Sequence, residues 1–187
     1  NHALSKKVTM QCAILLKNDD NFLPLPQKME GKEQQQQHLA VIGEFAKYPR
    51  YQGMGSSQLL PTKLDTAWDH MTSNYASIST MYAAGYSHKD DGTTVDTSLI
   101  DEAVRVAKLC KCVILFAGLP ESCESEGFDR SNMNLPLQQQ ELIEAVCDVN
   151  QNTVVVLCNG QPITMPWVDK PKSILEGYLA GQAGGSA

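Results

Sequence analysis

Short, continuously apolar runs separated by helical segments constrain the fold of this 187-residue chain more than any other feature. The runs occupy 39–43, 113–117 and 153–157. An apolar run of this length is typical of a strand that is buried on both faces. Between them, segment 97–109 has apolar residues at helical spacing, and a second helical segment begins at Pro136. This alternation predicts an α/β fold, a three-layer sandwich with a mainly parallel sheet flanked by helices on both faces.

Two helix starts are expected from their capping residues. Thr62 is expected to cap a helix that runs to His70, with Asp65 at the capping-box position. Thr97 or Ser98 is expected to cap the next helix. Weaker patterns predict a stretch over 4–17 that begins as a helix and ends in the apolar residues 13–16, strands at 78–82 and 174–179, and a polar surface loop at 27–38.

Composition excludes several classes of partner. The net charge is −6, so the phosphate backbone of a nucleic acid is not an expected partner. No apolar run approaches the roughly 20 residues that span a bilayer, so no membrane partner is expected. The four histidines show no metal-ligand spacing. We therefore expect neither a metal nor a cofactor.

Cysteine usage and the chain ends indicate the context of the domain. The six cysteines occur without a CxxC pair, which favours reduced thiols in a cytoplasmic protein over a disulfide framework. The chain begins without Met or a signal-peptide pattern and stops in the glycine-rich segment 181–187, directly after an apolar segment. We expect one domain, 1–187, from a larger protein.

Three polar loops follow the expected strands, at 44–58, 119–130 and 159–162. The carboxyl ends of parallel strands share one edge of a sheet, which predicts that these loops converge. The second loop carries three Glu, one Asp and one Arg within ten residues. Crowded carboxylates repel one another, which predicts that at least one keeps a proton near neutral pH, as a general acid must. Glu126 is the first candidate and Glu124 the second.

The first loop, 44–58, allows three interpretations. Gly53 and Gly55 suggest nucleotide binding, but the third glycine is missing and the motif begins well past the strand. A sugar-facing loop is the second interpretation, because Tyr and Arg offer flat faces and Ser and Gln offer hydrogen bonds. The third is an ordinary surface loop whose glycines serve turns. The candidate sugar contacts are Arg50, Tyr51, Gln52, Ser56 and Ser57.

A set of short motifs runs along nearly the whole chain. They are Leu-Leu-Lys-Asn at 15–18 with Leu-Pro-Leu at 23–25, Val-Ile-Gly at 41–43, the loop 51–57, Glu-Ser-Glu-Gly-Phe-Asp-Arg at 124–130, the segment 154–160, Met-Pro-Trp at 165–167 and Gly-Gln-Ala-Gly-Gly at 181–185. In this order they resemble the C-terminal α/β-sandwich domain of glycoside hydrolase family 3, the β-glucosidase family.

The resemblance implies a retaining β-glycosidase that hydrolyses terminal β-D-glucosyl residues of a β-glucoside or oligosaccharide. Glu126 matches the family's acid/base position, Glu124 is the alternative, and Asp129 and Arg130 would support the loop. The Asp nucleophile is implied to lie on an upstream barrel domain of the same protein. It follows that the isolated chain is inactive and that the sandwich lacks its own last elements.

Other functions stay open at this point. Xylose and arabinose are alternatives to glucose as the sugar. A non-catalytic module that binds carbohydrate or a partner could share the same fold. A small-ligand protein of flavodoxin type is a third class.

Overall fold

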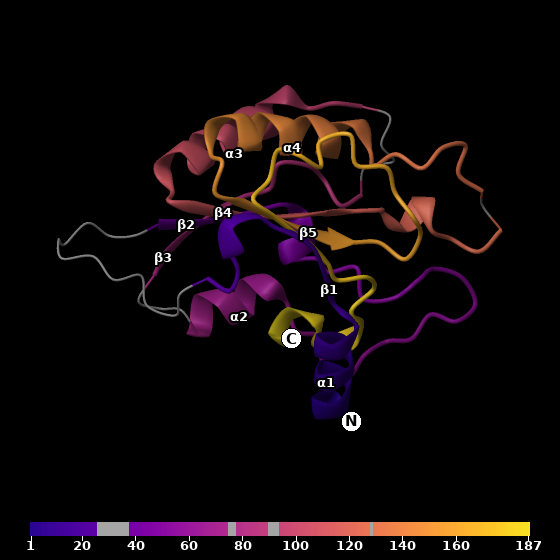
Figure 1. Cartoon of the computed structure of the whole chain (residues 1–187). Coiled ribbons are helices and arrows are strands. Elements are labelled where there is room, and N and C mark those ends of the chain that lie inside the picture. Colours follow the sequence, from indigo (N-terminus) through magenta and orange to yellow (C-terminus); the bar gives the residue numbers. More distant parts are fainter. Residues whose placement is uncertain (26–37, 75–77, 90–93, 128) are drawn as a thin grey trace.

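A computed structural model describes residues 1–25, 38–74, 78–89, 94–127 and 129–187 (Figure 1). The strands in this part of the chain are β1 (Ile14–Asn18), β2 (His38–Ile42), β3 (Ser79–Ala83), β4 (Cys112–Gly118), β5 (Thr153–Cys158) and β6 (Ser173–Glu176). The helices are α1 (His2–Cys12), α2 (Ala67–Asn74), α3 (Thr97–Leu109) and α4 (Leu137–Val149). Short 3₁₀ turns are η1 (Asp19–Asn21), η2 (Glu44–Ala46), η3 (Glu121–Cys123) and η4 (Gly181–Ser186). The predicted polar loop 27–38 lies outside the described residues except for His38, which begins β2.

The strands form one sheet in the order β1-β6-β5-β4-β2-β3. Every neighbouring pair is parallel except β1 with β6, which is antiparallel. Strand β4 is buried along its whole length and pairs with both β2 and β5. The predicted, mainly parallel sheet is therefore confirmed, and its centre coincides with the longest apolar run.

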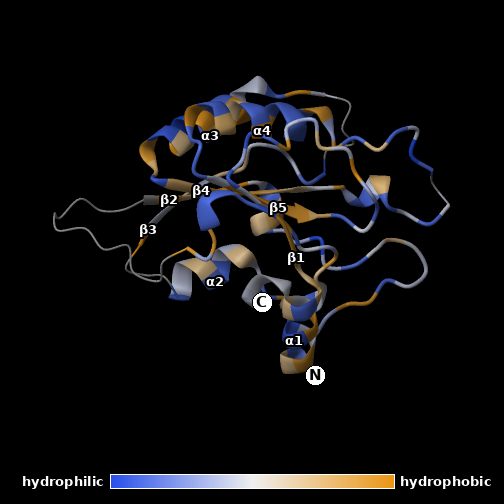
Figure 2. Cartoon of the chain, in the orientation of Figure 1, coloured by the Kyte–Doolittle hydropathy of each residue, from blue (hydrophilic) through white to orange (hydrophobic). Residues whose placement is uncertain are grey.

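Helices cover both faces of this sheet. Figure 1 shows α3 and α4 on one face, and α2 and α1 with η4 on the other. Figure 2 shows β4 and β5 in apolar colours between helices that carry both colours. The predicted three-layer architecture is confirmed. No helix in the part of the chain that the structure describes is long and apolar enough to cross a membrane.

The predicted start of α2 is wrong. The hydroxyl of Thr66, next to the first residue of the helix, accepts a hydrogen bond from the Asp69 N–H at 3.0 Å, which is the capping contact that we had assigned to Thr62. Asp65 does not close a capping box, because its carboxylate lies 2.7 Å from the ring of His2 in α1. Asp65 therefore links α1 to the segment before α2 instead of capping a helix.

The predicted cap of α3 is wrong by one or two residues. Asp96, rather than Thr97 or Ser98, occupies the N-cap position. Its carboxylate accepts from the Ser98 N–H at 3.0 Å. A carboxylate at this position also lies favourably in the field of the helix N-terminus.

The order in which the chain adds strands to the sheet changes direction between the parallel neighbours β2 and β4. After β2 it continues through α2 to β3, whereas after β4 it continues through α4 to β5, and these helices lie on opposite faces (Figure 1). The loops that follow β2 and β4 therefore diverge where the two strands lie side by side. In doubly wound sheets this point leaves a crevice in which ligands bind.

Gly43 allows the end of β2 to lie against β4. A Cβ at this position would lie only 2.2 Å from the Phe116 carbonyl oxygen, and φ is +104°. A side chain is excluded by both the space and the backbone conformation. The first loop consequently starts in direct contact with the central strand.

Candidate active site

Glu124 joins the three loops at the carboxyl edge of the sheet. Its Oε2 atom accepts from the Arg50 Nη2 atom at 3.1 Å. Its Oε1 atom accepts from the backbone N–H groups of Gly160 at 2.7 Å and Gln161 at 2.8 Å. We call Arg50, Glu124, Gly160 and Gln161 the inner junction. The convergence predicted from topology is confirmed, since these residues come from all three loops.

Arg50 is buried within the inner junction. Its Nε atom donates to the Leu119 carbonyl at 2.9 Å and its Nη1 atom donates to the Gln52 carbonyl at 3.1 Å. Glu121 lies 3.5 Å from the same Nη1 atom. The guanidinium therefore links the first loop to the second, and its predicted contact with a sugar stays a prediction.

Glu126 points to the other side of the second loop. Its carboxylate is exposed, and its Oε2 atom accepts from the Ser56 N–H at 3.2 Å and from the Ser56 hydroxyl at 2.9 Å. These two donors lower the pKa of the Glu126 carboxyl below its usual value, the backbone N–H having the larger effect. In this domain the carboxylate form is favoured.

The expectation that crowding keeps a carboxyl of this loop protonated is therefore wrong at Glu126. The two candidate carboxylates do not face each other, because Glu124 turns inward to Arg50 and Glu126 turns outward to Ser56. Spacing in the sequence did not indicate this separation, which depends on donors from another loop.

Glu176, which the sequence analysis missed, is the carboxyl at this edge that is driven toward its neutral form. Burial raises its pKa, and the nearby charge of Glu124 raises it further. Its partners are the Tyr178 N–H at 2.9 Å and the Asn159 Nδ2 atom at 3.3 Å. The Asn159 Oδ1 atom is buried and has no hydrogen-bond partner among the described residues. The one available signal was an acid at the end of an apolar run.

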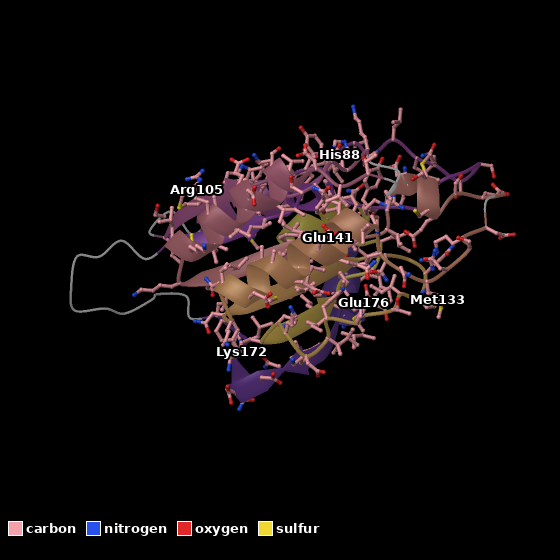
Figure 3. The ribbon with its side chains drawn as sticks, turned by 90° about the horizontal axis from the view of Figure 1, so that it is seen from above. His88, Arg105, Met133, Glu141, Lys172 and Glu176 are labelled. Carbon is pink, nitrogen blue, oxygen red and sulfur yellow. The ribbon has the colours of Figure 1, made fainter. Side chains whose placement is uncertain are left out.

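Arg130 connects the second loop to the third. Its Nε atom donates to the Gln161 Oε1 atom at 3.0 Å, and its Nη2 atom donates to the Pro162 carbonyl at 2.8 Å. Asp129, its neighbour, is exposed. Figure 3 shows that this end of the sheet also carries His88, Met133 and Glu176, whereas Lys172 lies toward the opposite end.

Comparison with known proteins identifies the family. A sequence model of the glycosyl hydrolase family 3 C-terminal domain matches residues 13–187. This chain belongs to glycosyl hydrolase family 3.

The family 3 domain has relatives of known name and structure. It is 46% identical over its full length to thermostable beta-glucosidase B of Acetivibrio thermocellus, and covers 23% of that protein. It is 43% identical over 98% of its length to an exo-alpha-(1->6)-L-arabinopyranosidase of Bifidobacterium breve, and covers 24% of it. The crystal structure of the Bifidobacterium adolescentis GH3 beta-glucosidase superposes with a TM-score of 0.86 at 40% identity, over 98% of this chain and 25% of that one. The chain thus spans about a quarter of the length of these relatives.

Hydrogen bonds between neighbouring residues hold the first loop of the family 3 domain in its conformation. The Gln52 side chain donates to the Tyr51 hydroxyl and to the Leu59 carbonyl, each at 3.0 Å, and accepts from the Leu59 N–H at 3.0 Å. Ser57 is exposed. The loop is therefore braced from within, and contacts of Tyr51, Gln52 and Ser57 with a sugar stay predictions.

A surface hollow of about 370 Å³ lies between the first and second loops of the family 3 domain, and the sequence analysis did not single out its aromatic wall. Tyr48 stacks on His88 with ring centroids 4.2 Å apart. Glu121 and Ser122 line the same hollow. In the described residues, no cluster of three His, Cys, Asp or Glu side chains could hold a metal ion.

Proposed function

We propose that this domain supplies the acid/base carboxyl, Glu126, to a retaining β-glycosidase. The observation that supports this most directly is the contrast in accessibility between the two candidates. Glu126 is exposed on the loop that follows β4, whereas Glu124 is buried with both of its oxygens bonded inside the domain. A group that transfers a proton to a substrate needs contact with it, and only Glu126 offers that.

The chemistry requires a second carboxylate outside this domain. A retaining glycosidase places two carboxyl groups about 5–5.5 Å apart, one as nucleophile and one as acid/base. We infer that an Asp on an upstream barrel domain of the same protein attacks the anomeric carbon. Glu126 protonates the departing oxygen, and then removes a proton from the water that hydrolyses the glycosyl-enzyme.

The acid step needs a protonated Glu126, although Ser56 lowers its pKa in this domain. A neighbouring nucleophile carboxylate and the exclusion of water both raise the pKa of a carboxyl group. Assembly with the barrel would supply both changes. The proposal therefore predicts that the 187-residue chain alone does not hydrolyse glycosides, and enzymatic turnover of a nitrophenyl glucoside by the chain alone would contradict it.

The substrate that we propose is a β-glucoside or oligosaccharide with a terminal β-D-glucosyl residue. The name of the Acetivibrio relative supports this choice. The arabinopyranosidase is almost as similar to this chain, at 43% against 46% identity. We infer that this domain contributes the proton-transfer group. Selection of the sugar then depends on residues that differ between the two relatives or that lie outside this domain.

The experiment compares Glu126→Ala with Glu121→Ala in the full-length enzyme that contains this domain. Glu126→Ala should slow substrates with poor leaving groups by roughly 10²–10⁴-fold, because these need protonation of the departing oxygen. Activated aryl glycosides should lose less in the first step, and the glycosyl-enzyme should accumulate. Azide should restore turnover and yield a β-glycosyl azide, since it attacks without a general base.

Glu121 is a matched control, because it is an exposed glutamate of the same loop. Its replacement should show no dependence on the leaving group. Rescue by azide of Glu124→Ala, without rescue of Glu126→Ala, would place the acid/base at Glu124 and overturn the assignment.

A further inference from the structure

We propose that Gly55 and Ser56 form a cradle that positions the Glu126 carboxylate, so that Ser56 is a positioning residue for the acid/base and not a contact for the sugar. We call Gly55, Ser56 and Glu126 the outer cradle. The functional part of this inference rests on the proposed role of Glu126, whereas the contacts themselves do not.

Ser56 holds one oxygen of Glu126 with two donors. The Ser56 N–H and hydroxyl lie 3.2 Å and 2.9 Å from the same Oε2 atom. The two residues are 70 positions apart and lie on different loops. A fork of two donors restricts both the position of the carboxylate and the rotation of its side chain. Because both lone-pair directions of Oε2 are engaged, a substrate would approach the carboxylate from the side of Oε1.

Gly55 provides the space for this contact. A Cβ on Gly55 would lie 2.8 Å from the Glu126 Cβ atom and 2.8 Å from its Oε2 atom, and φ is +107°. A side chain at this position would displace Glu126 and would strain the loop. Gly53 differs, because a Cβ there would meet nothing within 4 Å. The two glycines of this loop therefore have separate roles.

Arg50, Glu124 and Arg130 have their partners outside the outer cradle. Glu121 and Glu124 both pair with Arg50 in the first loop. Arg130 donates to the third loop, and Asp129 is exposed. The effect of Ser56 on Glu126 is therefore a hydrogen-bonding effect between neutral donors and a carboxylate. Since such donors stabilise the ionised form, Ser56 keeps Glu126 in the carboxylate form with which the base step begins, and its removal should raise the pKa of Glu126.

The first experiment is an NMR titration of the Glu126 carboxyl carbon in the 187-residue chain. Ser56→Ala removes the hydroxyl and keeps the N–H, so the pKa of Glu126 should shift upward. Ser56→Thr, which keeps a hydroxyl, should stay close to the wild type. Ser57→Ala is the matched control and should leave the titration unchanged. Equal titrations of wild type and Ser56→Ala, with unchanged amide spectra of the core, would overturn the cradle.

The second experiment measures kcat/KM against pH in the full-length enzyme. Ser56→Ala should move the basic limb of the profile to higher pH, whereas a merely structural loss would lower the curve without moving it. Gly55→Ala should reduce kcat/KM by roughly 10–100-fold through misplacement of the carboxylate, and Gly53→Ala should have little effect. Equal effects of the two glycine variants would overturn the role of Gly55.

The outcomes separate this inference from the proposed function. If the Glu126 titration responds to Ser56→Ala but Glu126→Ala shows no dependence on the leaving group, the cradle stands and the proposed function fails. If Glu126→Ala behaves as an acid/base variant but Ser56→Ala moves neither the titration nor the basic limb, the cradle fails and the proposed function stands.

Discussion

The inner junction and the outer cradle each hold a glutamate of the second loop, and they hold it in opposite ways. At the inner junction, Glu124 is buried and accepts three hydrogen bonds, one of them from a buried Arg50. At the outer cradle, Glu126 is exposed and is held through one oxygen by Ser56. Residue type alone does not distinguish a carboxylate that is bonded inside the domain from one that is open to solvent. The number and burial of its donors do.

Physical chemistry explains why the two carboxylates are held so differently. A buried carboxylate is tolerated only where hydrogen bonds and an opposite charge replace its hydration, so its oxygens are already committed. An exposed carboxylate keeps its hydration and can exchange water for substrate at little cost. Placed two positions apart, Glu124 fixes the loop and leaves Glu126 at the surface.

The largest expected effect is the loss of the buried ion pair. Arg50→Ala leaves Glu124 without its cation and removes the bonds to Leu119 and Gln52, so the free energy of unfolding should fall by about 3–5 kcal/mol. Urea unfolding of the chain, followed by circular dichroism, measures this change. Arg105→Ala on the exposed face of α3 is the matched control and should cost no more than about 0.5 kcal/mol. Equal losses of unfolding free energy in the two variants would show that the inner junction contributes no more to stability than an ordinary surface residue.

A smaller effect, with a distinct pH dependence, is expected at Glu176. Its pKa is raised above 4.5 in the folded chain by burial, so the folded state binds more protons than the unfolded state above that pH. The stability of the wild type should therefore fall as pH rises from about 4.5 through the raised pKa of Glu176. Glu176→Gln removes the titrating group and therefore this slope.

Urea unfolding of both proteins at several pH values tests this expectation. The variant should gain stability relative to the wild type as pH increases over that window. A difference that stays constant with pH would show that Glu176 titrates normally, and that the inner junction does not extend to β6.

Arg130→Ala should have a modest effect, because its two hydrogen bonds join exposed parts of the second and third loops. We expect a loss of about 1 kcal/mol in the free energy of unfolding. Hydrogen exchange at Gln161 and its neighbours should accelerate while exchange in β4 stays slow. Faster exchange throughout the sheet would indicate that Arg130 belongs to the inner junction.

The smallest effect on stability is expected at the outer cradle. Glu126→Gln keeps the shape of the side chain and an acceptor for Ser56, and the group is exposed. Its urea midpoint should coincide with that of the wild type, in contrast to Arg50→Ala. A clear loss of stability would mean that Glu126 supports the fold, and that the contrast between the two regions is smaller than we describe.

The sequence allowed the parallel sheet to be predicted, because strands such as β4 are buried on both faces and so are apolar without interruption. The meeting of the three loops followed from the same reasoning. The hydrogen-bond partners of individual side chains could not be predicted in this way. Glu124 and Glu126 look alike in a sequence, and the donors that separate them, Arg50 and Ser56, lie about 70 positions away. Local rules also misplaced the start of α2, because Asp65, which was expected inside the helix, precedes it and contacts His2.

The pairing of β1 with β6 has a consequence for how the domain is made. Asn18 and Ser173 meet across the sheet although they are 155 positions apart. At ordinary rates of translation, β1 leaves the ribosome roughly 8–30 s before its partner exists. Its side chains at Ile14, Leu15 and Leu16 are 46–49% exposed in the six-stranded sheet of this chain. An apolar strand with open backbone groups is a template for pairing with other chains, so β1 is open to such pairing until β6 has been synthesised.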